Sequence, residues 1–388
     1  MSRKNIPYGK QHITQADIEA VVEVLKSDFL TQGPAIAAFE KAFAQYIGCQ
    51  YAVAVANGTA ALHLCTLALE VNETSKVITS PITFAASANC VRYCGGEVVF
   101  ADIDPQTALL DIEKVKALLE ASPNETYQGI IPVDFAGYPV NMEAFRALAE
   151  EYNLWLIEDA CHAPGGYFTD SHGKPQNCGN SNYADLAIFS FHPVKHIASG
   201  EGGMITTNRK DLYEKLIQLR THGITKEPHL LKENHGGWYY EMQTLGYNYR
   251  LPDILAALGI SQLSRAAENL EKRKAIAKRY DEAFQGTAIK PLAAAEGHAY
   301  HLYVIQTEKR KELYDYLREH TIYSQVHYIP VHQQPYYKQW NAYSLPNAEA
   351  YYAQCLSLPM YPSLTKEEQA FVIEKVLEFV KQKNISTF

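Results

Sequence analysis

The stretch FSFHPVKHIASGEGGMITTN, residues 189–208, places one lysine, Lys195, between two strand-like segments. DLAIFSF (185–191) precedes the lysine, and MITTN (204–208) follows it after a cluster of three glycines. Lysine is rarely buried without a partner, but in a strand-end connection it can lose its charge by desolvation and attack a carbonyl. The glycines would let the backbone come close to a bound group. The alternative is a surface lysine in a glycine-rich turn, and the rest of the sequence is needed to choose between these two interpretations.

Strand-length apolar runs alternate with helical segments from about residue 50 to 220. The runs lack polar alternation, which indicates strands buried on both faces. Amphipathic helices are predicted over 110–122 and 141–152. This alternation is typical of an α/β fold with a mostly parallel central sheet. The predicted strands are 77–81, 97–103, 129–135, 154–160, 185–191 and 204–208.

The C-terminal third has a different pattern. We expect a long helix over about 252–284, followed by a smaller α+β domain. The predicted division is therefore a large domain over 1–250, with an N-terminal segment, and a connecting helix with a small domain over 251–388. In the small domain, the expected strands are 301–307 and 321–329, and the expected helices are about 308–320 and 365–383.

Composition and charge narrow the class of protein. The 388 residues are 47% hydrophobic, which is enough for a large core, and the formal net charge of -8 argues against a nucleic-acid partner. No apolar window is long enough to span a membrane, and the N-terminal residues do not resemble a secretory signal. Seven scattered cysteines without a CxxC pair suit a reducing compartment. We expect a cytoplasmic protein without disulfides.

An anion site is predicted in AVANGTAALHL, residues 54–64. A strand is expected to end at Ala56, and Asn57-Gly58-Thr59 then turns into a helix. Backbone N–H groups at the helix start and the Thr59 hydroxyl suit a phosphate. A plain Asn-Gly turn with a threonine cap would explain the same residues.

Acidic residues close the next strand of interest, in LIEDACHAPG (156–165). Glu158 and Asp159 end an apolar run, and His162 follows. An aspartate in this place is costly unless it has a cationic or hydrogen-bonding partner, and a protonated ring nitrogen is one such partner. The alternative is a capping aspartate beside a core histidine.

Two further patterns complete the survey. GYNYRLPD places Asn248 and Arg250 just before a helix that is expected to start at Pro252, although this is also an ordinary helix entry. His192 and His196 have an i, i+4 spacing, but no carboxylate stands near them in a HExxH-like arrangement, so we expect no metal.

Together these features describe pyridoxal 5′-phosphate (PLP) chemistry. A phosphate site at a helix start, an aspartate at a strand end and a lysine 36 residues later are the parts that this cofactor needs. The lysine forms a Schiff base with the cofactor, and the aspartate keeps the pyridine nitrogen protonated.

The chain also resembles a known family over nearly its whole length. The motifs TQGP, NGTAALHL, PITFAASAN, EDACHAPG, SFHPVKHIASGEGGM, GYNYRLPD and QVHYIPVH occur in the order found in the DegT/DnrJ/EryC1/StrS family. The resemblance implies the fold type I of PLP-dependent transferases and a sugar aminotransferase activity. Within the family, the chain is similar to the branch that aminates C4 of a UDP-linked 4-keto-6-deoxy-L-sugar in pseudaminic acid biosynthesis. Segment 166–185 follows no pattern that assigns it a role.

The resemblance also implies roles for individual residues. Lys195 corresponds to the Schiff-base lysine, Asp159 to the partner of the pyridine nitrogen, and His162 to the residue near the phenolic oxygen. Asn248 corresponds to a phosphate contact donated by the other subunit of a homodimer. The remaining expected cofactor contacts are Gly58, Thr59, Ala60, Phe84 and Ser190, and the expected substrate contacts are Tyr8, Arg250, His327 and Tyr328.

The expected activity is transamination, with glutamate as donor and UDP-2-acetamido-2,6-dideoxy-beta-L-arabino-hexos-4-ulose as acceptor. Alternatives remain open, namely an aminotransferase acting on a UDP-D-xylo or dTDP-linked keto sugar, a PLP-dependent sugar dehydratase, and a PLP-binding regulator without turnover. A dehydrating branch of the family has histidine in place of the lysine. Because Lys195 is present here, transamination is favoured.

Overall fold

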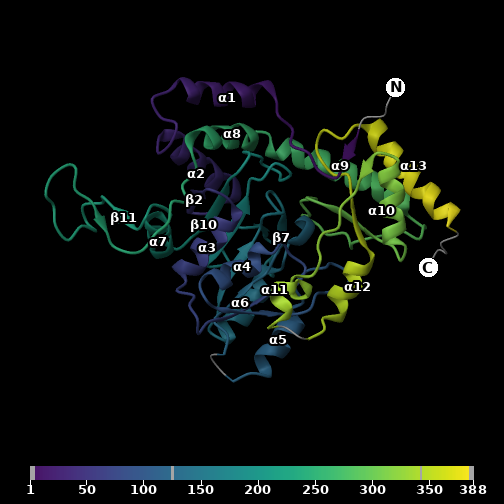
Figure 1. Ribbon diagram of the computed structural model, residues 1–388, viewed down its shortest axis with the longest axis horizontal. Coiled ribbons are helices and arrows are strands. Elements are labelled where there is room, and N and C mark those ends of the chain that lie inside the picture. Colours follow the sequence, from purple (N-terminus) through teal and green to yellow (C-terminus); the bar gives the residue numbers. More distant parts are fainter. Residues whose placement is uncertain (1–4, 124–125, 341–342, 384–388) are drawn as a thin grey trace.

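A seven-stranded sheet forms the centre of the molecule in the computed structural model, which describes residues 5–123, 126–340 and 343–383 (Figure 1). The order of its strands is β2-β10-β9-β6-β5-β3-β4. All neighbours are parallel except β10, which runs antiparallel to both β2 and β9. The prediction of an α/β fold with a mostly parallel sheet is confirmed. The strands are β2 (Tyr51–Val55), β3 (Lys76–Thr79), β4 (Glu97–Phe100), β5 (Gly129–Ile131), β6 (Trp155–Asp159), β9 (Leu186–Ser190) and β10 (Gly203–Thr207).

Helices cover the sheet on both faces, which explains its unbroken apolar strands. The two helices predicted by amphipathic periodicity are present as α5 (Ile112–Glu120) and α6 (Met142–Glu151). The other helices of this part are α1 (Gln15–Lys26), α2 (Pro34–Ile47), α3 (Gly58–Ala68), α4 (Ala86–Tyr93) and α7 (Lys210–Arg220), with the short turn η1 (Phe135–Gly137).

The strand directions bring several strand ends to one edge of the sheet. Val55, Ser190 and Gly203 are register partners, so the end of β2, the end of β9 and the start of β10 lie at the same level. The parallel strands β3 and β6 end at the same edge. In an open α/β sheet, ligands bind beyond the carboxyl ends of the strands, and this edge is therefore where a site is expected.

The predicted long helix over 252–284 is wrong in one respect, because it is two helices. α8 (Asp253–Leu263) and α9 (Ala266–Phe284) are separated at Ser264 and Arg265. The Ser264 hydroxyl donates to the Ser261 carbonyl at 2.7 Å, which competes with continuation of the helix. Pro252 is the residue before the helix, not its first residue.

The predicted strand over 321–329 is also wrong in length. Only β15 (Ile322–Tyr323) is a strand, and it pairs with β1 (Ile6–Pro7). β1 has two residues, and its Pro7 has no N–H to extend the ladder. Over the rest of the predicted strand, residues 324–329, the described chain forms only an isolated bridge, between Gln325 and Ser357 of β16.

The C-terminal part has a core of its own, built around Tyr280, Tyr303 and Phe379. The remaining predictions for this part are confirmed within a few residues by β14, α10 and α13. The boundary between 250 and 251 stays a prediction, and residues 1–4, 124–125, 341–342 and 384–388 of the two predicted domains lie outside the described residues. The elements are β13 (Lys290–Pro291), β14 (Tyr303–Gln306), β16 (Cys355–Leu358), α10 (Arg310–Glu319), α11 (Pro335–Lys338), α12 (Pro346–Gln354), α13 (Lys366–Gln382) and η2 (Val331–Gln333).

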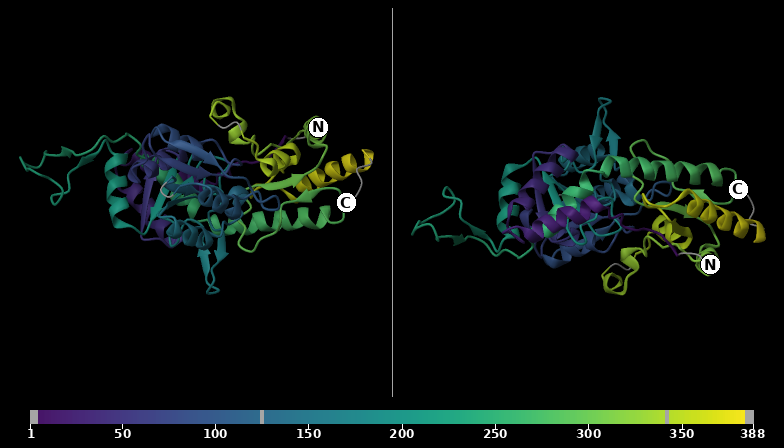
Figure 2. Two further views of the ribbon diagram at one scale, coloured as in Figure 1. Left: turned by 90° about the horizontal axis from the view of Figure 1, so that it is seen from below. Right: turned by 90° about the horizontal axis from the view of Figure 1, so that it is seen from above.

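Two hairpins project from the body of the molecule (Figure 2). One is the arm that follows α7, with β11 (Ile224–Thr225) paired to β12 (Glu241–Met242). The other, β7 (Tyr167–Thr169) with β8 (Pro175–Asn177), lies in the segment to which the sequence assigned no role. Among the described residues, no helix is long and apolar enough to cross a lipid bilayer, and all seven cysteines are free thiols.

Candidate active site

A pocket of about 890 Å³ opens at the edge of the sheet where the strands end. Segments that follow β2, β3, β6 and β9 line one side, and residues near the start of β14 and after β15 line the other. Most of the predicted site residues meet here. Those that line the pocket are Tyr8, Gly58, Thr59, Ala60, Phe84, Asp159, His162, Ser190, Lys195, His327 and Tyr328.

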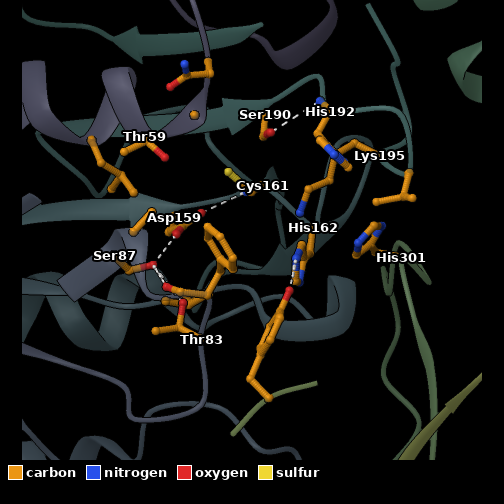
Figure 3. Close-up of a pocket in the computed structure, with 18 of the residues that line it drawn as sticks. Thr59, Thr83, Ser87, Asp159, Cys161, His162, Ser190, His192, Lys195 and His301 are labelled. Atoms are coloured by element: carbon orange, nitrogen blue, oxygen red, sulfur yellow. Dashed lines mark hydrogen bonds between the residues drawn. The ribbon is translucent and has the colours of Figure 1, made fainter. Parts of the chain in front are cut away.

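Lys195 lies in a turn directly after β9, where its backbone N–H donates to the His192 carbonyl at 2.8 Å. Figure 3 shows its amine pointing into the pocket beside His162. No described residue accepts a hydrogen bond from this amine. Burial lowers the pKa of the Lys195 amine, while Cys161 and Asp159 partly oppose the shift. A larger share of the amine is therefore neutral and able to act as a nucleophile or base.

One glycine of the cluster is needed for packing within the chain. A Cβ atom on Gly203 would lie 2.6 Å from the carbonyl oxygen of Asn57. Gly203 is therefore needed so that β10 can pass the turn that leads into α3, and the close approach is between two parts of the chain. This contact packs the start of β10 against the turn that leads into α3.

The start of α3 has the features of an anion site. The side chain of Asn57 caps the helix by accepting from the Ala60 N–H at 2.8 Å, so that donor is already used. The N–H groups of Gly58 and Thr59 and the Thr59 hydroxyl have no acceptor among the described residues. They line the pocket together with Ser190. Free donors at the positive end of a helix dipole suit a phosphate.

Asp159 is 5% exposed and is held by hydrogen bonds, and no described residue forms an ion pair with it. Its Oδ2 accepts from the Ser87 hydroxyl at 2.7 Å, and its Oδ1 accepts from the backbone N–H of Cys161 at 3.2 Å. A carboxylate has about four acceptor positions, so one more donor can be accommodated from the pocket.

His162 is fixed as one neutral tautomer. Its Nδ1 accepts from the backbone N–H of Ala136 at 3.2 Å, which places the ring proton on Nε2. Nε2 lies 3.4 Å from the Tyr328 hydroxyl. Burial, followed by the positive charge of Lys195, lowers the pKa of His162 well below its usual value. The imidazole thus offers an N–H donor to the pocket without carrying a charge.

The opposite wall brings polar and aromatic groups to the pocket. Tyr8 packs against His327 with ring centroids 5.1 Å apart, and His327 Nδ1 lies 2.8 Å from the Ser357 hydroxyl. Phe84 is 62% exposed, so its ring face is available to a flat ligand. His332, four residues after Tyr328, is not part of the pocket lining, and its Nε2 lies 3.3 Å from a Glu349 carboxylate oxygen.

Asn248 and Arg250 are not among the residues that line the pocket. Their backbones bridge to Thr221 and Val55, respectively. The expectation that Arg250 contacts substrate is therefore not met within a single chain. The contact of Asn248 with the site of another subunit stays a prediction.

The histidine pair does not form a metal centre. His192 is exposed at the pocket, whereas His196 is buried with Nε2 2.8 Å from the Ala299 carbonyl. Among the described residues, the one group with ligand-like spacing is Asp134, Glu158 and Cys178, all buried behind the pocket. Asp134 and Glu158 are neighbouring carboxyls whose pKa values are raised, chiefly by burial. A shared proton is the simpler way to bury them together.

Comparison with known proteins shows to which family the chain is related. The DegT/DnrJ/EryC1/StrS aminotransferase family model matches residues 11–377. The chain belongs to this family.

Relatives within the family match over almost their full length. The spore coat polysaccharide biosynthesis protein SpsC of Bacillus subtilis (strain 168) is 39% identical, with 97% of each chain covered. The UDP-4-amino-4,6-dideoxy-N-acetyl-beta-L-altrosamine transaminase of Campylobacter jejuni (serotype O:23/36, strain 81-176) is 38% identical, with 97% of this chain and 99% of the relative covered.

Solved structures also match the chain over almost its full length. Helicobacter pylori PseC, an aminotransferase involved in the biosynthesis of pseudoaminic acid, has a TM-score of 0.89 at 31% identity, covering 98% of this chain and 100% of that one. The PMP form of the putative sugar aminotransferase Spr1654 from Streptococcus pneumoniae has a TM-score of 0.88 at 30% identity, covering 97% and 100%. The fold is therefore the type I fold of PLP-dependent transferases, as the sequence resemblance implied.

Several pocket residues of this DegT/DnrJ/EryC1/StrS chain were not predicted. Thr83 and Ser87 lie in the quoted motif PITFAASAN, and their i, i+4 spacing was the available signal. Cys161 lies between two predicted residues. His301 gave no local signal, because its place beside His162, with ring centroids 4.2 Å apart, depends on chain segments far apart in sequence.

Proposed function

We propose that this chain is a PLP-dependent aminotransferase that transfers the amino group of glutamate to C4 of a nucleotide-linked 4-keto-6-deoxy sugar. The observation that carries the proposal is that the Lys195 amine and the Asp159 carboxylate face one pocket, together with free N–H donors at the start of α3. These three groups are the ones that PLP needs from the protein, namely a lysine for the Schiff base, a carboxylate for the ring nitrogen and donors for the phosphate.

The residues fit PLP at each of its polar ends. Gly58, Thr59 and Ser190 offer donors for the phosphate, and Asp159 has acceptor capacity left for a ring N–H. When bound, PLP supplies an electron sink for the electrons released at the amino donor's Cα. Asp159 would keep the ring nitrogen protonated, and the Nε2–H of His162 would donate to the phenolic oxygen. Phe84 would cover one face of the ring.

In this proposal Lys195 has two roles. Its amine would hold the cofactor covalently in the resting enzyme, and the freed amine would take the proton from the amino donor's Cα. The lowered pKa of Lys195 favours both roles, because each requires the neutral amine.

The acceptor is proposed to be UDP-2-acetamido-2,6-dideoxy-beta-L-arabino-hexos-4-ulose. The name of the C. jejuni relative supports this substrate, since its product carries the new amino group at C4. Tyr8, His327 and Tyr328 supply hydrogen-bonding groups on the wall opposite Lys195, where a sugar would enter. A site built from such groups penalises analogues that leave them unpaired.

A homodimer with composite sites is part of the proposal. Asn248 is exposed and outside its own pocket, and the neighbouring arm carries Trp238 and Leu245 at 76% and 74% exposure. Large apolar side chains exposed in this way are typical of a protein interface. Asn248 and Arg250 are proposed to reach the phosphate and the substrate of the partner subunit.

The test is turnover on matched substrates. The purified protein is incubated with glutamate and the UDP-L-arabino, UDP-D-xylo or dTDP-linked 4-keto sugars, and kcat/KM and product mass are measured. The expected result is an aminated product with the highest kcat/KM for the UDP-L-arabino sugar. Preference for a dTDP sugar or amination at C3 would overturn the substrate assignment, whereas dehydration or absence of turnover on all sugars would overturn the aminotransferase.

A further inference from the structure

Two hydroxyl groups stand behind the Asp159 carboxylate. Ser87 Oγ lies 2.7 Å from Asp159 Oδ2, and Thr83 Oγ1 lies 2.8 Å from Ser87 Oγ. Ser87 is in the first turn of α4, Thr83 precedes that helix, and both are almost fully buried. Figure 3 shows the three side chains next to one another on the side of the pocket away from His192.

The chemistry of the three groups fixes the direction of the hydrogen bonds. An ionised carboxylate only accepts, so the Ser87 hydroxyl must donate to Asp159. Ser87 has one proton, and with that proton given to Asp159 its oxygen can only accept from Thr83. The result is a directed chain of donors from Thr83 to Ser87 to Asp159.

This series of hydrogen bonds is important because Asp159 has no cation beside it among the described residues. Its charge is buried, and apart from the Cys161 N–H the Ser87 hydroxyl is its other donor. A hydrogen bond to a charged buried group contributes more than one between neutral groups, and hydrogen bonds in a chain strengthen one another. Without Ser87, Oδ2 would be left unpaired and the carboxylate would be free to turn.

We propose that Ser87 and Thr83 are positioning residues, which hold the Asp159 carboxylate in the orientation that accepts a ring N–H from the pocket. The proposal rests on the proposed role of Asp159 toward the cofactor nitrogen. Ser87 acts directly on the carboxylate, and Thr83 acts through Ser87. Neither residue is proposed to exchange a proton with substrate.

The test uses a cofactor analogue that lacks the nitrogen in question. Apoprotein is titrated with PLP and with 1-deaza-PLP, in which a carbon replaces the ring nitrogen, and Kd is measured for each by equilibrium dialysis. The ratio of the two Kd values reports the contact between Asp159 and the ring nitrogen. Contacts with the phosphate and the ring face are the same for both ligands and cancel in the ratio.

The variants are Ser87→Ala, Thr83→Val, Thr83→Ser and a matched control, Ser80→Ala. Ser80 is a buried serine of the same loop, and within the described part of the chain its hydroxyl forms hydrogen bonds only with the backbone of Ile82. We expect Ser87→Ala to reduce the preference for PLP about tenfold or more, and Thr83→Val to reduce it less. Thr83→Ser, which keeps the hydroxyl, and Ser80→Ala should retain the wild-type preference.

Turnover gives a second readout. Ser87→Ala is expected to lower kcat about 10- to 100-fold with KM for both substrates changed less than about threefold, because substrate binding does not involve this contact. A loss of folding alone would reduce the amount of active protein and leave the Kd ratio of the folded fraction unchanged.

Asp159→Asn distinguishes a failure of the proposed role of Asp159 from a failure of the proposed positioning role of Ser87. If Asp159→Asn leaves the Kd ratio unchanged, the proposed role of Asp159 is wrong. If Asp159→Asn abolishes the preference for PLP while Ser87→Ala keeps it, the role of Asp159 stands and the positioning role of Ser87 is overturned.

Discussion

The Nδ1 atom of His162 accepts a hydrogen bond from the backbone N–H of Ala136 at 3.2 Å. Ala136 has a left-handed backbone conformation, with φ of 60°, at the turn that follows β5. A non-glycine residue in this region is uncommon, and here it directs an N–H at the ring of a pocket histidine. The backbone thus selects the tautomer of a side chain that we propose to contact the cofactor.

We expect His162 to stay neutral with its proton on Nε2 from about pH 6 to 8. Burial lowers the pKa of His162 well below its usual value of 6.5, so the imidazolium forms only at more acidic pH. Nitrogen-15 NMR of the imidazole groups distinguishes the two tautomers and the charged ring. A titration of His162 near pH 6.5, or a proton on Nδ1, would contradict this expectation.

Lys195 is expected to be the residue that carries the cofactor. The purified protein should show an absorption band of bound PLP that borohydride abolishes by fixing the cofactor on the lysine. Peptide mapping should place the reduced adduct on Lys195, and Lys195→Ala should yield none, because its turn is where the amine enters the pocket. An adduct on another lysine would disprove the assignment.

Asp159→Asn is expected to keep the fold but to lose turnover by roughly 100-fold or more. The amide can still accept at Oδ1 from the Cys161 N–H, so packing is retained. It carries no charge to stabilise a protonated ring nitrogen. The measurement is kcat together with the melting temperature, and a near-normal kcat in the folded variant would remove Asp159 from this role.

The pair Asp134 and Glu158 is expected to make stability depend on pH. Burial raises the pKa of Asp134 from its usual 3.8 to about 7, so between these values the folded chain binds more protons than the unfolded chain. Stability from this group is therefore present at low pH and is lost as pH rises toward 7.

Asp134→Asn removes this carboxyl while keeping its shape and an acceptor for the Val140 N–H. The difference in unfolding free energy between the variant and the wild type should shift in favour of the variant by at least about 1 kcal/mol as pH rises from 4.5 to 7.5. Denaturant unfolding at several pH values measures the difference. A difference that does not change with pH would show that burial does not raise the pKa of Asp134.

Local sequence patterns predicted the site residues that lie at the ends of strands. Lys195 and Asp159 each follow an apolar run, and parallel pairing brings such ends together, so the site could be located from the sequence. Ser87 and His301 were missed because their contacts depend on tertiary packing between segments far apart in the chain. The break at Ser264 was missed because the apolar periodicity continues across it, while a side-chain hydrogen bond ends the helix.

Asn248 is expected to complete the site of a partner subunit. It is exposed and outside the pocket of its own chain, so any contact with the cofactor has to come from a second copy. Asn248→Asp places a negative charge where a phosphate is proposed to bind and should inactivate the enzyme. Lys195→Ala is inactive for a different reason, because it removes the amine of its own site.

Mixing the two inactive variants should restore activity. In a hybrid dimer, the site that uses Lys195 of the Asn248→Asp chain receives an intact Asn248 from the Lys195→Ala chain, so one site of each hybrid is complete. Random exchange of subunits should give about a quarter of the wild-type activity, because half of the dimers are hybrids. The control is a mixture of Lys195→Ala with Asp159→Asn, since both residues belong to the same chain's pocket and no hybrid site is complete. Equal recovery in both mixtures, or full activity of a monomer in dilute solution, would disprove the composite site.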